Sequence, residues 1–172
     1  MGFIIDGKDL YESIATGPQG THGTMGTRGS MGSMGSAGGQ YNPSPNDHAY
    51  NGEIETITAG ETLGIMNVGY LKSDGKYWKT KADSASTSVG QLRLGVGTIN
   101  TNSTGTVLIK GYLRDDSIAT KTVGGNLYLS VATKGAFNQT APSSSGNQVR
   151  IIGTATGTKV VYFNPDNTYI EI

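Results

Sequence analysis

Cysteine is absent from this chain of 172 residues, so disulfide bridges, thiol nucleophiles, zinc–thiolate sites and iron–sulfur clusters are excluded. Histidine is nearly as scarce, and the only two, His22 and His48, argue against a histidine-rich metal site. Charged residues make up 15% of the chain, and 13 basic residues balance 13 acidic ones. Without a positive excess, we expect no binding to nucleic acid or to anionic membranes.

Long apolar runs are also missing. No stretch approaches the roughly 20 apolar residues that a membrane-spanning helix needs. The first residues, Met1–Lys8, lack both the basic leader and the apolar segment of a secretory signal. We therefore expect a soluble protein made in a reducing cytoplasm.

Glycine, by contrast, is abundant and partly periodic. It occupies every third position through eight consecutive triplets, at Gly17, Gly20, Gly23, Gly26, Gly29, Gly32, Gly35 and Gly38. In a collagen-like triple helix three chains wind together, and only glycine fits at the crowded axis. The alternative is a flexible Gly/Ser linker, which needs no period. The register predicts a homotrimeric Gly-X-Y stalk over residues 17–40, spanning about 70 Å at roughly 3 Å per residue.

The stalk is expected to be weak by itself, because Pro18 is the only proline in its X and Y positions. It would need trimeric parts at both ends. The segment before it, residues 1–16, could form two helical turns over Asp9–Ala15. It is too short to build a core, so its apolar side chains are predicted to anchor the chain to a partner surface. These anchor residues are Phe3, Ile4, Ile5, Leu10, Tyr11 and Ile14.

From residue 53 to 172 the sequence becomes a series of short β-like runs separated by turn signals, and residues 41–52 are a predicted linker. Asp74-Gly75 between two such runs indicates a tight hairpin, because its turn needs positive φ. Many short strands at regular spacing predict a mainly β fold, an antiparallel sandwich or barrel. The predicted strands are Glu53–Thr58, Ile65–Lys72, Lys76–Thr80, Gln91–Ile99, Thr106–Arg114, Asn126–Val131, Ala136–Gln139, Gln148–Ala155, Lys159–Phe163 and Thr168–Ile172.

No combination of residues predicts catalysis. His48 lies in a Pro/Asn turn region without a rigid surrounding. The pair Asp115-Asp116 is interpreted as a solvated acidic turn at a strand end. Asp166, between two asparagines, could bind calcium, but a plain turn is the favoured interpretation. Aromatic residues in the strands could stack on sugars, although a core or trimer-interface role is favoured. We therefore predict no enzyme, cofactor, catalytic residue or metal site.

Four stretches in residues 61–172 resemble a small β module of tailed bacteriophages. They are Val68–Lys79, Gly124–Ser130, Thr140–Gly153 and Val161–Ile172. Modules of this kind are found in capsid decoration and head-fibre proteins, and sometimes at fibre ends. The resemblance implies a structural virion protein and not an enzyme, and by itself it does not distinguish head from tail. We expect a location on the capsid surface and synthesis in the cytoplasm of a host bacterium.

Together these features predict a trimeric head fibre or decoration protein with an N-terminal anchor, a stalk and a β-rich knob. Its expected partner is the major capsid protein or another head protein. The alternative is the receptor- or glycan-binding tip of a phage tail fibre, with a host-surface glycan as a further partner.

Overall fold

The computed structural model describes residues 4–5, 8–9 and 46–172. In the first unit, β1 (Ile4–Ile5) and β2 (Lys8–Asp9) form an antiparallel pair in which Ile4 lies opposite Asp9. Asp9 is therefore in a strand, at the position where the sequence analysis allowed a short helix to begin. The rest of that segment and the predicted stalk, residues 17–40, lie outside the described residues.

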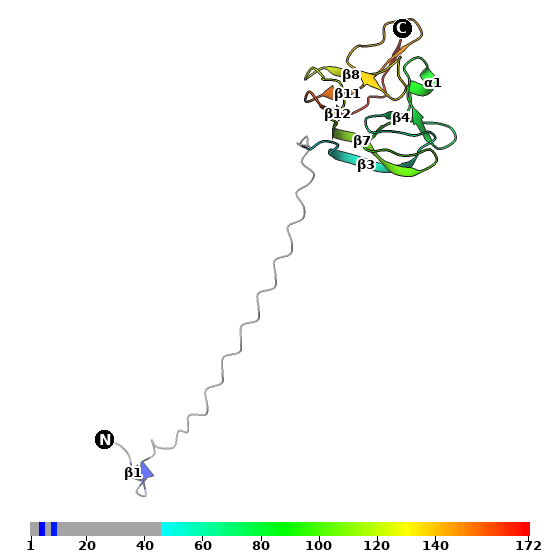
Figure 1. The fold of residues 1–172 in the computed structure, drawn as a ribbon. Coiled ribbons are helices and arrows are strands. Elements are labelled where there is room, and N and C mark those ends of the chain that lie inside the picture. The colour runs from blue at the N-terminus through cyan, green and yellow to red at the C-terminus, as the bar shows by residue number, and fades with distance from the viewer. Residues whose placement is uncertain (1–3, 6–7, 10–45) are drawn as a thin grey trace. The chain divides into compact units, whose positions relative to one another are not determined.

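The chain divides into two compact units, and the described part of the second is residues 46–172. We call residues 46–172 the β unit, because they are mainly β, as predicted (Figure 1). Its first strand begins at Tyr50, three positions before the expected start of the knob. The strands are β3 (Tyr50–Thr58), β4 (Val68–Leu71), β5 (Tyr77–Lys79), β6 (Leu92–Gly95), β7 (Thr104–Arg114), β8 (Asn126–Leu129), β9 (Phe137–Asn138), β10 (Gln148–Val149), β11 (Ile151–Ala155), β12 (Val160–Phe163) and β13 (Ile170–Glu171).

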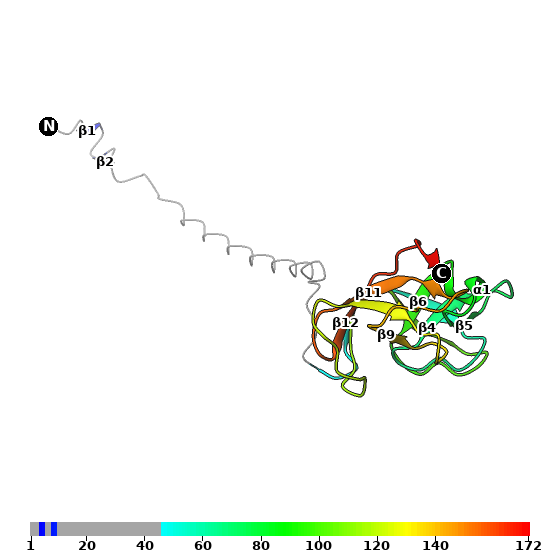
Figure 2. The same cartoon turned by 90° about the horizontal axis from the view of Figure 1, so that it is seen from above.

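Nine of these strands form one antiparallel sheet in the order β5-β4-β6-β7-β12-β11-β8-β9, with β3 paired to β7. The sheet curls, as Figures 1 and 2 show. Its two ends meet through Gly135, whose carbonyl accepts a hydrogen bond from Val68 N at 2.8 Å and whose N–H donates to Thr80 O at 2.7 Å. β10 and β13 form a separate two-stranded sheet.

The hairpin signal is confirmed. β4 and β5 pair antiparallel around the turn, and Gly75 has a φ of 76°. Of the two adjacent aromatics in β5, Tyr77 is buried and Trp78 is only partly covered. The Trp78 indole N–H donates to Asp74 Oδ2 at 3.0 Å, and Lys72 Nζ lies 4.5 Å from the centre of its ring. The outer face of the hairpin is thus a small polar–aromatic cluster.

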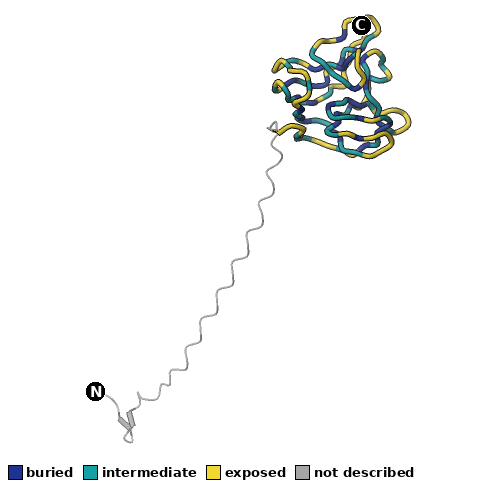
Figure 3. Tube along the Cα trace, viewed as in Figure 1, coloured by how far each residue is buried: buried dark blue, intermediate teal, exposed yellow. Residues whose placement is uncertain are grey.

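The long strand β7 lies in the interior of the sheet and pairs with three other strands. One edge pairs with β3 along its whole length, and the other pairs first with β6 and then with β12. Its successive residues Val107 and Leu108 are both buried but belong to different apolar clusters. Because side chains alternate along a strand, β7 carries a core on each of its faces. Figure 3 shows how buried, intermediate and exposed residues are distributed along the chain trace.

Two opposed glycines let β3 and β7 approach closely. Gly52 and Gly111 face each other in the ladder, with φ angles of 150° and 147°. A Cβ atom at either position would collide with the backbone of the other strand. The conformation and the lack of space both demand glycine here.

A short helix, α1 (Ala85–Ser88), was not predicted, because four residues give no helical period. Among the residues that the structure describes, no helix has the length and apolar character needed to cross a bilayer.

One buried arginine ties α1 to two other parts of the unit. Arg150, between β10 and β11, is 1% exposed. Its guanidinium donates to Ser88 O at 2.8 Å, to Gly90 O at 2.9 Å, to Asp166 O at 2.6 Å and to Asn167 Oδ1 at 3.1 Å. Burial lowers the pKa of Arg150 from its usual value, and Asp166 opposes this effect.

We predict that Arg150→Met destabilises the β unit by about 3 kcal/mol, since it leaves several buried carbonyl oxygens without donors. Urea unfolding followed by Trp78 fluorescence measures the change. Arg114→Met is the control, because Arg114 makes an exposed pair with Asp116 and should leave the midpoint almost unchanged. Equal midpoints for the two variants would contradict the role given to Arg150.

Candidate functional site

Most residues proposed from the sequence for attachment and trimerisation lie outside the described residues. For Ile4 and Ile5 the structure gives only their backbone place in β1. Not described are the anchor residues Phe3, Leu10, Tyr11 and Ile14, and the axis residues Gly17, Gly20, Gly23, Gly26, Gly29, Gly32, Gly35 and Gly38. The candidate site described next lies in the β unit.

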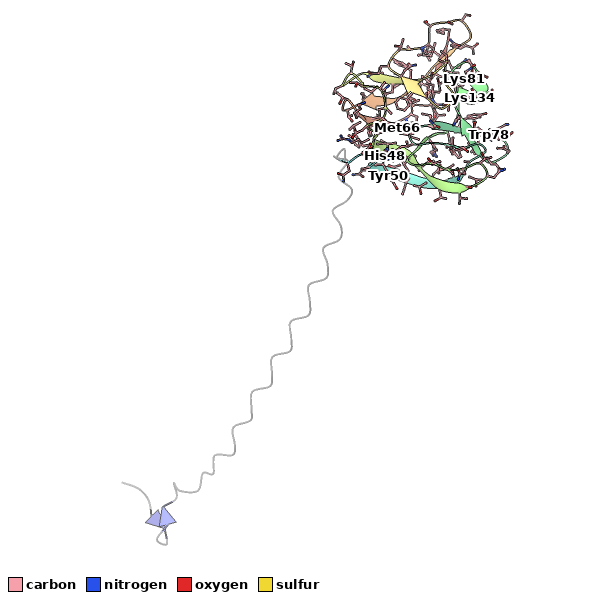
Figure 4. The ribbon with its side chains drawn as sticks, viewed as in Figure 1. His48, Tyr50, Met66, Trp78, Lys81 and Lys134 are labelled. Carbon is pink, nitrogen blue, oxygen red and sulfur yellow. The ribbon has the colours of Figure 1, made fainter. Side chains whose placement is uncertain are left out.

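A cluster of polar side chains links the start of the β unit to the residues that follow β7. His48 Nε2 lies 3.4 Å from Asp47 Oδ2 and 3.8 Å from Asp115 Oδ1. Asp47 Oδ1 accepts a hydrogen bond from Asp116 N at 2.8 Å, across 69 positions of sequence. His48 has a φ of 59°, in the left-handed region. Figure 4 shows His48 beside Tyr50, where β3 begins.

The ligand atoms of Asp47, His48 and Asp115 lie within 4.8 Å of one another, close enough to share a cation. Exposed groups of this kind are also common as simple ion pairs, and Asp47 and His48 are both exposed. The cluster connects residues 47–48 to the end of β7 through these side-chain contacts. The sequence analysis missed it, because 67 positions separate His48 from Asp115.

The interpretation of Asp115-Asp116 as a solvated turn is correct for Asp116 and wrong for Asp115. Asp116 is exposed and paired with Arg114, which is the main reason that its pKa is lowered. Asp115 is only 2% exposed. Its Oδ1 accepts hydrogen bonds from Ser117 N at 2.8 Å and from Ser117 Oγ at 2.6 Å. The outcome differs because the chain turns after β7 and folds back over Asp115.

The plain-turn interpretation of Asp166 agrees with the structure. Its Oδ1 accepts hydrogen bonds from Thr168 N and Thr168 Oγ1, at 2.9 and 3.1 Å. These contacts are the largest causes of its lowered pKa. Asp166 therefore shapes the turn that Arg150 holds.

Asp115 also lines a cavity of about 350 Å³. The cavity lies between the turn at residues 65–67, the loop at residues 115–121 and the start of β9. Most of its wall is apolar, and four polar side chains reach it. The lining residues are Ile65, Met66, Asn67, Asp115, Ser117, Ile118, Ala119, Lys121, Ala136 and Phe137.

Each wall of the cavity is held by hydrogen bonds. Met66, which has a φ of 60°, donates its N–H to Gly95 O at 2.8 Å. Asn67 Oδ1 accepts from Gly64 N at 3.0 Å. In the loop, Lys121 N donates to Thr158 O at 2.9 Å, and the ammonium of Lys159 donates to Ile118 O. The walls of the cavity are thus held in place by the fold itself.

The charges at the cavity are not mutually paired. Within residues 46–172, the ion pairs of the structure include no partner for Lys121. Its Nζ lies 5.5 Å from the centre of the Phe137 ring. Burial lowers the pKa of Lys121, and the charge of Lys159 lowers it further. The charged form of Lys121 is therefore disfavoured, because its ammonium is partly buried and lies near the positive charge of Lys159.

Comparison with known proteins adds no identification: no protein-family model matches the chain, and no curated protein matches it significantly.

We predict that Lys121→Met leaves the stability of the β unit unchanged or raises it, because the cation has no carboxylate partner and loses hydration. The lowered folded-state pKa means that the wild-type free energy of unfolding gains with pH in the range just below 10.5, and the variant should lack this gain. Urea unfolding at pH 7 and pH 10 measures both effects. Lys159→Met is the comparison, and it should destabilise because the bond to Ile118 O is lost.

Proposed function

We propose that the protein is a trimeric fibre or decoration protein of a bacteriophage head, attached by residues 1–16 and displaying the β unit. The observation that carries this proposal is the unbroken Gly-X-Y register of residues 17–40, placed directly before a self-contained β unit. A triple helix requires three chains, and a β unit with its own core can be carried at its end.

The architecture of the β unit supports the proposal that it is carried at the end of a stalk. Its sheet closes on a continuous apolar cluster, and Arg150 locks the remaining loops to it. The described residues 46–172 thus contain a buried apolar core of their own. Two apolar side chains near its beginning, Tyr50 and Ile54, are 42% and 49% exposed. In a homotrimer, contacts between copies would remove such surfaces from water.

The proposed partner is the major capsid protein or another head protein, and the proposed location is the capsid surface. The apolar anchor residues favour attachment to a protein surface, since they are too few to form a core. The alternative, a receptor-binding tip of a tail fibre, is favoured by one feature of the structure: the preformed cavity beside Asp115 and Lys121.

We predict that the full-length protein is a trimer of the 17.9-kDa chain at micromolar concentration. The reason is that a Gly-X-Y helix has no stable single-chain form. Light scattering after size exclusion measures the mass. A monomer or a dimer would contradict the stalk.

Gly26→Val tests the same point locally, because the side chain would crowd the axis. Protease should then cut residues 17–40 faster, while the β unit keeps its urea midpoint.

We predict that replacing Ile4, Ile5 and Leu10 by Ser abolishes attachment to the phage particle and leaves a soluble trimer. The physical reason is the loss of apolar contact with the partner surface. Particles grown with each version are purified, and the copy number is measured by quantitative mass spectrometry. The matched control replaces the exposed Leu71, Ile151 and Ile170 of the β unit by Ser. Normal incorporation of the first variant would show that the anchor lies elsewhere.

A further inference from the structure

The cavity beside Asp115 has chemical requirements that narrow the class of its ligand. Asp115 presents a buried carboxylate, which can only accept hydrogen bonds, so a ligand group facing it must donate. A hydroxyl group meets this requirement without adding another charge. Ser117 in the same loop and Asn67 in the turn at residues 65–67 also line the cavity and add polar groups to it.

Lys121 sets a different requirement for the ligand, because an ammonium favours a negatively charged group. It lines the same cavity, and Lys159 is close enough to influence its charge. Lys121 is the one cation among the residues that line the cavity, and Ser117 already stabilises the Asp115 carboxylate with two hydrogen bonds. An anionic ligand group near Lys121 would supply the opposite charge that this ammonium lacks in the ion pairs of residues 46–172, which a neutral ligand cannot do.

The remaining wall is apolar, with Ile118 and Phe137 beside Lys121 and with Met66 in the opposing turn. An apolar wall with an aromatic ring suits the carbon–hydrogen face of a sugar ring. A cavity of about 350 Å³ is near the lower end of the range for small-molecule sites. Its size suits one or two sugar rings, and its preformed walls reduce the entropic cost of binding.

We propose that this cavity binds a sugar acid, a pyranose ring that carries a carboxylate. The carboxylate pairs with Lys121, ring hydroxyls donate to Asp115, and the apolar side of the ring packs against Phe137. Binding itself does not depend on the fibre architecture. The suggestion that the site recognises an acidic glycan of a host surface rests on the alternative function, the receptor-binding tip of a tail fibre.

The test uses the full-length protein and methyl β-D-glucuronide, with methyl β-D-glucoside as the uncharged partner. Titration followed by NMR should give a Kd for the glucuronide on the order of 1 mM, typical of a single weak site. The glucoside should bind at least about tenfold more weakly, because it lacks the anion that pairs with Lys121. Equal affinities for the two glycosides, or no binding of either at about 50 mM, would overturn the proposal.

Three further measurements locate the site and check the ligand class. Lys121→Met should weaken glucuronide binding about tenfold or more, and Asp115→Asn should weaken both glycosides. The matched control is Lys76→Met, which removes an ammonium in the β4–β5 turn that does not line the cavity. It should bind like wild type. Unchanged binding by Lys121→Met, or tighter binding of the zwitterion alanine than of the glucuronide, would contradict the proposal.

These results are separable from the test of the fibre. A monomer in light scattering would overturn the trimeric stalk and leave glucuronide binding to be judged by its own titration. A trimer that binds neither glycoside would leave the fibre proposal in place and overturn the sugar-acid site.

Discussion

The buried guanidinium of Arg150 is the interaction on which the loops of the β unit depend. Its four hydrogen bonds join α1, the segment after it and the turn at residues 164–167 to the junction of β10 and β11. None of these segments is itself a strand of the nine-stranded sheet. A buried cation without its acceptors is costly, so the four acceptors and Arg150 stabilise one arrangement together.

The strand β7 connects this framework to the candidate site. Its residues Val107 and Leu108 belong to two different apolar clusters, so β7 packs against two cores at once. Its end delivers Asp115 to a place where His48 lies on one side and the cavity on the other. A site built at the end of such a rigid strand keeps its geometry better than one built on loops alone. The hydrogen bond that Asp47 accepts places the start of the unit against the same strand end.

The lysine at the cavity shows how stability and binding can make different demands. Lys121 has lost hydration without gaining a carboxylate, an arrangement that does not favour the folded state. Lys159, by contrast, uses its ammonium to hold the Ile118 carbonyl and thereby the loop. A cation that contributes little to folding but faces a preformed cavity is the arrangement expected of a residue kept for a ligand.

Local chemistry made most of the β unit predictable from the sequence. The Asp74-Gly75 turn and the short β-like runs between turn signals indicate their structures by short-range rules, and the strands appear within a few residues of their expected places. α1 escaped prediction because four residues carry no period. The burial of Asp115 also escaped, because it depends on where the chain folds after the strand and not on neighbouring residues.

By itself, the sequence determined the mainly β character of residues 46–172, their turns and the glycine register before them, since each depends on residues a few positions apart. Only the tertiary structure decided which strands became neighbours, that Arg150 would be buried, and that Asp115 would share a cavity with Lys121 and lie beside His48. These are contacts between segments distant in the chain. Their partners are selected by the closing of the whole sheet around its core, which no local pattern encodes.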